Sequence, residues 1–179
     1  MRLVKLAVLS LVVLFCVLTA MSLLIPSHVR ISRAINLHAS AEGIFHLIDN
    51  PDQWPQWYPA FQKQNATALL QQHQVHITTM MKTDTLRTMR WQQAGKRPVI
   101  NGWHLHRFTA PDSATLQWYM DFQLSWYPWQ KFSSLFYEKT YGTMMEQGLQ
   151  NIKRLAEDAA PAGAFRSQSP PHTAAPDGG

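Results

Sequence analysis

The chain has 179 residues, of which 46% are hydrophobic, and this length and composition predict one globular domain. Its formal net charge is +5, but two of the positive charges belong to Arg2 and Lys5 at the N-terminus and the others are scattered. Without a basic stripe we expect no nucleic-acid partner, and anionic lipid head groups suit the charge better.

An uncharged apolar segment covers residues 6–25. A helix of this length, at about 1.5 Å per residue, spans a hydrocarbon layer of about 30 Å. We therefore predict an N-terminal membrane anchor within residues 1–28. A cleaved signal peptide is the alternative, and it would need a shorter apolar region followed by small residues. Cys16, the single cysteine, is interpreted as a small apolar residue of this helix.

The orientation of the anchor is predicted from its flanking basic residues. Arg2, Lys5 and the α-amino group precede the apolar segment, and Arg30 and Arg33 follow it. This margin of one charge favours a cytoplasmic N-terminus, with residues 29–158 forming a domain outside the cytoplasm.

The domain is predicted to begin with a strand over residues 29–37, whose apolar face is interrupted by Arg33. Ser40 is a good N-cap for a helix that stops at Asn50 and Pro51. The closely spaced prolines of residues 51–59 allow only a short helix or turn. From Ala66 to Trp126 the pattern is that of an antiparallel meander, with six strands in the whole domain as the upper limit.

The strand over residues 114–126 has the clearest alternation. One face carries Ala114, Leu116, Trp118, Met120, Phe122, Leu124 and Trp126, and the other face is polar. The helix that follows has two apolar faces about 150° apart at about 100° per residue. We therefore predict a break near residues 137–140, a main helix to about Asp158, and a disordered tail over residues 159–179.

Two stretches resemble a known family. Residues 35–48 with residues 50–57 are similar to the first strand, helix and tryptophan-bearing helix of the SRPBCC or START-like superfamily, which includes polyketide cyclases and lipid-transfer domains. The second stretch is similar to the closing helix of that family. The residues that carry this similarity are Gly142, Glu146, Gly148, Leu149, residues 151–153 and Glu157. The resemblance implies an α+β helix-grip fold, in which a curved antiparallel sheet wraps around a long C-terminal helix with an apolar cavity between them. Some relatives also carry a membrane span directly before the first strand.

A ligand-binding site is expected in that cavity. The residues proposed to line it are Trp54, Trp57, Trp103, Trp118, Met120, Phe122, Tyr141, Met145 and Leu149. Tryptophan favours both cores and binding sites, so a packing role for the tryptophans stays open beside the lining role. Gly148 on the apolar face of the helix has two explanations as well: close approach to the sheet, or room for a ligand.

No metal, cofactor or catalytic residue is assigned. His104 and His106 share a strand face, and His73 and His76 could lie on a neighbouring strand, but zinc needs three or four convergent ligands. Asp121, Glu138 and Glu146 are interpreted as surface charges, because no pair of titratable groups forms a recognisable catalytic arrangement.

Three functions remain open from the sequence. The first is a membrane-tethered START-like domain that binds a hydrophobic small molecule or lipid between the sheet and the C-terminal helix. The second is an enzyme of the polyketide cyclase/dehydrase kind, and it requires at least one buried ionisable group. The third is a protein-interaction module at the membrane surface that uses the exposed edge at residues 126–129.

Overall fold

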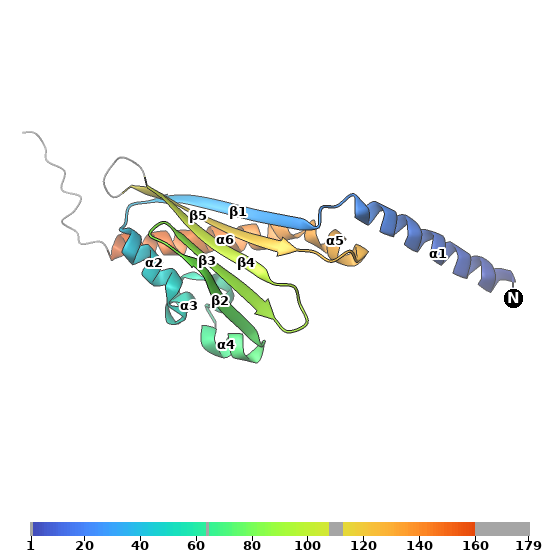
Figure 1. The fold of residues 1–179 in the computed structure, drawn as a ribbon, viewed down its shortest axis with the longest axis horizontal. Coiled ribbons are helices and arrows are strands. Elements are labelled where there is room, and N and C mark those ends of the chain that lie inside the picture. The colour runs from blue at the N-terminus through green and yellow to red at the C-terminus, as the bar shows by residue number, and fades with distance from the viewer. Residues whose placement is uncertain (1, 64, 108–112, 160–179) are drawn as a thin grey trace, which may run out of the picture.

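Five antiparallel strands form a single curved sheet in the computed structural model of the protein, which describes residues 2–63, 65–107 and 113–159 (Figure 1). The strands are β1 (His28–Leu37), β2 (Val75–Lys82), β3 (Leu86–Gln93), β4 (Val99–Arg107) and β5 (Ala114–Gln123). Their order in the sheet is β1-β5-β4-β3-β2, so β2 to β5 form a meander and β1 pairs with β5. The α+β class and the meander are therefore confirmed, with one strand fewer than the upper limit.

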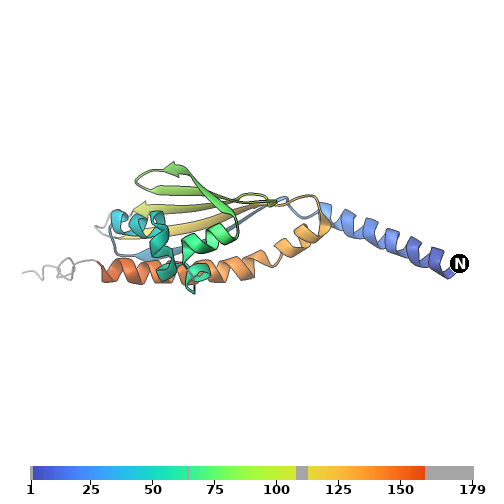
Figure 2. The same ribbon diagram turned by 90° about the horizontal axis from the view of Figure 1, so that it is seen from below.

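The C-terminal helix α6 (Tyr137–Asp158) lies across one face of the sheet (Figure 2). Met145, Leu149 and Ile152 point from it into the core and are at most 1% exposed. The shorter α5 (Pro128–Ser134) precedes it, and Leu135 and Phe136 interrupt the helix between the two. The predicted break is confirmed, but it lies slightly before residues 137–140.

Short helices lie on the same face of the sheet as α6. Helix α2 (Ala41–Asp49) begins at the predicted cap, since Ser40 Oγ accepts a hydrogen bond from Gly43 N at 3.2 Å. The prolines then divide the chain into three short turns of helix, as expected. These are the 3₁₀ turn η1 (Pro51–Gln53), α3 (Trp54–Trp57) and the 3₁₀ turn η2 (Pro59–Phe61).

The β prediction for the start of the meander is wrong. Residues Ala66–Gln72 form helix α4, and Asn65 Oδ1 caps it by accepting a hydrogen bond from Thr67 N at 2.8 Å. Alanine, leucine and glutamine favour a helix, and the cap supplies the N-terminal partner that such a short helix needs.

Two expectations about β5 are also corrected. The strand ends at Gln123, so Trp126 leaves the apolar face and is 61% exposed. Asp121 is not a surface charge, because it is only 8% exposed. Arg30 on the neighbouring β1 donates to both of its carboxylate oxygens at 2.6 Å. Pairing with a bidentate guanidinium offsets the cost of burying this carboxylate.

The N-terminal helix α1 (Arg2–Leu23) projects away from the domain, and nearly all of its side chains are exposed (Figures 1 and 2). Among the described residues it is the one helix long and apolar enough to cross a membrane. Length and apolar character are equally compatible with a membrane span and with a signal sequence. The predicted tail lies outside the described residues, apart from Ala159.

Candidate ligand-binding site

A cluster of aromatic rings fills the centre of the space between the sheet and α6. Trp57 meets Trp118 edge to face, with ring centroids 5.6 Å apart, and Trp103 stacks on Trp118 at the same centroid distance. The indole nitrogens of Trp54 and Trp57 donate to the carbonyls of Ile48 and Leu47, both at 2.9 Å. All four tryptophans are at most 2% exposed, so they act as packing rather than as an open surface.

Beside this cluster a cavity of about 240 Å³ lies between β3, β4, β5 and α6. Its walls are Tyr58, Ala60, Val75, Trp91, Gln93, Lys96, Arg97, Val99, Asn101, Met120, Phe122, Tyr141 and Met144. Typical small-molecule pockets measure about 300–1,000 Å³. The cavity is therefore below the size of a pocket that encloses a whole membrane lipid, and it suits a small ligand or part of a larger one.

The structure brings three of the nine expected site residues to the cavity wall, namely Met120, Phe122 and Tyr141. The other six lie in the adjoining core and do not line it: Trp54, Trp57, Trp103, Trp118, Met145 and Leu149. The large apolar side chains at the middle of the sheet pack against one another and leave no cavity between them. The ligand-binding role of all nine residues stays a prediction.

Sequence reasoning missed a buried polar residue in the wall, Asn101. It alternates with Val99 and Trp103 on the apolar face of β4, and a polar side chain in such a row is a signal of a site. Asn101 is completely buried, and its Oδ1 accepts a hydrogen bond from Trp118 Nε1 at 3.3 Å. Its Nδ2 has no partner among the described residues.

Trp91 provides a second donor of this kind. Its indole ring stacks on Trp54 with centroids 5.3 Å apart, and its Nε1 is buried without a hydrogen-bond partner in the described part of the chain. Each such group costs about 1–3 kcal/mol in desolvation when it is unpaired. Two residues of the cavity wall therefore carry a buried N–H donor that lacks an acceptor among the described residues.

Two tyrosines add hydroxyl groups to the wall. Burial raises the pKa of Tyr58 well above its usual range, and the neighbouring Tyr141 adds to this effect. The pKa of Tyr141 is also raised, first by burial and then by Tyr137. Both phenols therefore stay protonated at neutral pH, and they are available as hydrogen-bond donors rather than as bases.

The charged groups of the wall lie at the hairpin between β3 and β4. This hairpin carries Lys96 and Arg97, and Arg97 Nε donates to Ser125 Oγ at 3.1 Å. Among the described residues, the cavity wall contains no aspartate, glutamate or histidine. The ionisable groups in contact with the cavity are thus phenols and cations.

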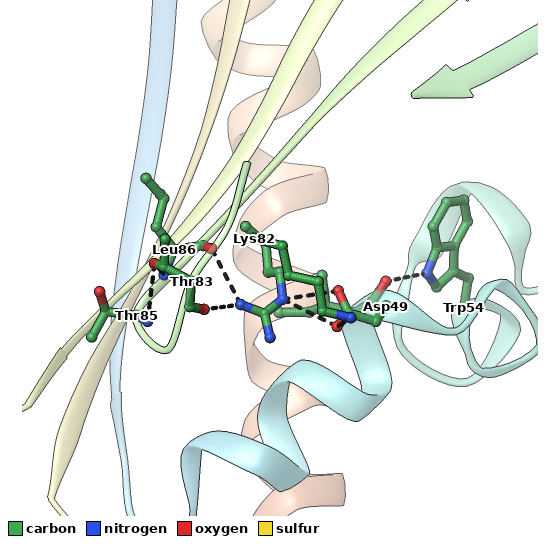
Figure 3. Close-up of polar contacts among 8 residues, drawn as sticks. Asp49, Trp54, Lys82, Thr83, Thr85 and Leu86 are labelled. Atoms are coloured by element: carbon green, nitrogen blue, oxygen red, sulfur yellow. Dashed lines mark hydrogen bonds and ion pairs between the residues drawn. The ribbon is translucent and has the colours of Figure 1, made fainter. Parts of the chain in front are cut away.

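A second hollow of about 680 Å³ lies outside the sheet, between α2 and the β2–β3 hairpin. Asp49 in this hollow forms ion pairs with Lys82 at 2.9 Å and with Arg87 at 3.1 Å (Figure 3). The guanidinium carbon of Arg87 lies 4.0 Å from the centroid of the Phe45 ring, and its Nη1 also donates to the carbonyl of Thr83. These polar groups form ion pairs and hydrogen bonds with one another, which indicates that they stabilise the packing of α2 against the hairpin.

The histidines do not converge. The rings of His104 and His106 lie 3.9 Å apart on β4, whereas His76 is on β2, which β3 separates from β4. His73 caps the end of α4. Over the described ranges no group of three or more histidine, cysteine or acidic side chains could hold a metal ion.

A curved antiparallel sheet that wraps around a C-terminal helix, with a cavity between the two, defines the helix-grip class of proteins. Residues 28–157 match the family described as polyketide cyclase / dehydrase and lipid transport, and the chain belongs to that family. The resemblance to the START-like superfamily is thereby confirmed. The sequence matches no curated protein.

Solved structures of low sequence identity share this fold. The di-domain ARO/CYC StfQ from the steffimycin biosynthetic pathway is 8% identical, with a TM-score of 0.53 over 73% of this chain and 51% of that chain. The di-domain ARO/CYC BexL from the BE-7585A biosynthetic pathway is 10% identical, with a TM-score of 0.53 over 72% and 46%. The chain thus spans about half the length of each. A START superfamily protein from Mycobacterium smegmatis is 16% identical, with a TM-score of 0.49 over 72% and 97%.

Proposed function

We propose that the domain binds an apolar small molecule that carries hydrogen-bond acceptor oxygens. The observation that supports this most directly is that two wall residues, Asn101 and Trp91, carry buried donors, Nδ2 and Nε1, without a partner among the described residues. A ligand carbonyl or hydroxyl would satisfy them, and Met120, Phe122 and Met144 would contact its hydrocarbon part. The family's description, which includes lipid transport, agrees with an apolar ligand.

Two bicyclic probes of nearly equal shape test this proposal. Tetralone carries one ketone, and tetralin lacks it. Binding is measured on the full chain in lipid nanodiscs, with protein-free nanodiscs as the blank. One added hydrogen bond contributes about 1 kcal/mol, so we expect tetralone to bind about fivefold more tightly. Equal affinity for both probes would contradict the acceptor requirement, and binding of neither would contradict the cavity as a site for ligands of this size.

Matched variants test whether the probe binds in this cavity. Met144→Trp fills the cavity and should abolish binding of both probes, whereas Gln147→Trp adds the same ring on the exposed side of α6 and should not. Trp91→Phe removes one donor and should remove most of the preference for the ketone. Trp103→Phe is the control, because its indole nitrogen is also buried without a partner among the described residues, but Trp103 does not line the cavity.

The second candidate is an enzyme of the cyclase or dehydrase kind. It is favoured by the family's description and by the buried phenol of Tyr58, an ionisable group in the cavity wall. Since both cavity phenols are held protonated, the chemistry they support is proton donation to a substrate oxygen rather than proton abstraction. Conversion of an aromatic-precursor polyketone by the wild-type chain, with loss of turnover in Tyr58→Phe, would favour this candidate over simple binding.

We further propose that α1 anchors the domain in the membrane, with the N-terminus in the cytoplasm. The support is the length and apolar character of the helix and the basic residues before it. The intact mass of the protein extracted from membranes distinguishes an anchor from a cleaved signal sequence. A reporter fused after residue 179 tests the side on which the domain lies.

A further inference from the structure

Five large apolar side chains are exposed together at one corner of the domain, which we call the aromatic corner. They are Trp126, Tyr127, Trp129, Leu135 and Phe136, between 37% and 68% exposed. The rings of Tyr127 and Trp129 stack with centroids 4.8 Å apart, and Trp126 lies 4.7 Å from Tyr127. In the described chain after Leu24, the other exposed large hydrophobic side chains are Met80 and Met81 on β2. An exposed aromatic cluster of this kind, with two further exposed apolar side chains at the other end of α5, is typical of an interaction surface.

The aromatic corner is fixed to the end of the apolar helix α1. Lys131 on α5 is only 4% exposed, and its Nζ donates to the carbonyl of Ile25 at 2.6 Å. The amide of Leu124 donates to the carbonyl of Ser27 at 2.8 Å. Helix α5 packs against α1, so both lie at the same end of the molecule (Figures 1 and 2). The depth of this corner relative to a bilayer is therefore set by the depth of α1.

We propose that the aromatic corner is a membrane-binding surface that lies in the interface of the leaflet from which α1 emerges. Tryptophan and tyrosine favour the head-group region, because an apolar ring and a polar N–H or O–H suit its two sides. Leu135 and Phe136, which do not fold back onto the core, contact the upper part of the acyl chains. Leu23 and Leu24 at the end of α1 are 70% and 86% exposed, and α1 packs against α5, so both helices present exposed apolar side chains at this end of the molecule.

With the aromatic corner in the membrane interface, the candidate ligand cavity lies on the side of the domain that faces the bilayer. The register pairs His28 with Gln123 and Val99 with Phe122, which places the start of β1, the start of β4 and the end of β5 at one end of the sheet. The cavity lies at that end, since Val99 and Phe122 are in its wall. The hydrogen bond from Arg97 to Ser125 holds the basic hairpin next to Trp126 of the aromatic corner, so Lys96 and Arg97 would meet anionic head groups.

The surface is tested by the depth of spin labels on the full chain. Cys16→Ser provides the background, and single cysteines replace Trp129, Phe136 or Met81 in vesicles of phosphatidylcholine and phosphatidylglycerol. Met81 is the matched control, because it is 50% exposed and lies at the other end of the sheet. We expect labels at positions 129 and 136 to be relaxed by oxygen and protected from a water-soluble nickel chelate, and the label at 81 to show the opposite.

Two outcomes would overturn the proposal. If positions 129 and 136 are as accessible to nickel as position 81, the corner faces water. If they are protected from both reagents, a protein covers it. Native tryptophan fluorescence gives an independent check: brominated lipids should quench the wild-type chain, and the double variant Trp126→Ser and Trp129→Ser should lose most of the quenching. The surface rests on the proposed anchoring by α1, but neither result depends on whether the cavity binds a ligand, so this surface and the proposed ligand binding can fail separately.

Discussion

The ring of Trp118 lies directly against Gly148 of α6. A Cβ at position 148 would be 2.8 Å from Cζ3 of this ring, a distance that real side chains do not tolerate without movement. Of the two explanations that the sequence left open for this glycine, close approach between helix and sheet is therefore supported. The helix packs at this point because its backbone, and not a side chain, meets the indole.

The first prediction is that Gly148→Ala destabilises the domain. Alanine gains about 1 kcal/mol in helix propensity, but overpacking a completely buried ring costs about 1–3 kcal/mol. We expect a net loss of up to about 2 kcal/mol, measured by urea unfolding of the full chain in micelles. Gln147→Ala on the exposed side of the same helix is the control and should be neutral or slightly stabilising. A more stable Gly148→Ala chain would show that the ring can move aside.

The second prediction separates the two cations that share Asp49. The side chain of Arg87 is 10% exposed, whereas that of Lys82 is 61% exposed. Replacing Asp49 by asparagine leaves a nearly buried guanidinium without its carboxylate, and we expect a loss of about 2 kcal/mol. Lys82→Met removes only a solvated partner of the same carboxylate and should cost less than about 1 kcal/mol.

Urea unfolding at low and high salt distinguishes these effects. The cost of Asp49→Asn should persist at high salt, because the buried pair is poorly screened, and the small cost of Lys82→Met should vanish. Equal costs for both variants would mean that the ion pair with Arg87 contributes no more than a surface pair.

Local patterns predict much of this fold. Alternation located the strands from Val75 onward, Ser40 located the start of α2, and the two apolar faces located the break before α6. The residues of the candidate site were harder to assign, because the same large apolar side chains can either fill a core or line a cavity. Trp57 and Trp118 fill the core, whereas Phe122 lines the cavity. Only the three-dimensional packing decides between these roles.

Buried polar residues explain two further differences. Asp121 was expected at the surface because its partner Arg30 is distant in the sequence and becomes its neighbour only through the register of β1 and β5. Asn101 likewise acquires its partner Trp118 from the adjacent strand. Pairing of this kind depends on tertiary structure, which a single sequence does not reveal.

The third prediction concerns Arg33, the residue that interrupts the apolar face of β1. Its guanidinium reaches Glu146 at 2.6 Å and Glu138 at 2.5 Å, and it fits because Gly142 has no side chain to obstruct it. A double-mutant cycle of Arg33→Gln with Glu146→Gln should give a coupling of about 0.5–1 kcal/mol at low salt. The coupling should shrink at high salt, since both carboxylates are more than half exposed. A coupling near zero at low salt would indicate that the pair with Glu146 adds nothing to the pair with Glu138.

The fourth prediction is a change in alkaline stability. Burial raises the pKa of Tyr58 in the folded protein, whereas the unfolded chain releases this proton near pH 10. Above that pH the folded state binds more protons than the unfolded state, so the free energy of unfolding falls as the pH rises. The contribution of Tyr58 is therefore complete below about pH 10 and is lost above it.

Replacing Tyr58 by phenylalanine removes this titration while keeping the ring that meets Trp118 edge to face at 5.1 Å. Over a series of unfolding measurements on the ligand-free chain from about pH 8 to about pH 11, we expect the variant to lose less stability than the wild type. Parallel slopes for Tyr58→Phe and the wild type would mean that the hydroxyl of Tyr58 reaches water through the cavity, which would make the cavity hydrated rather than dry.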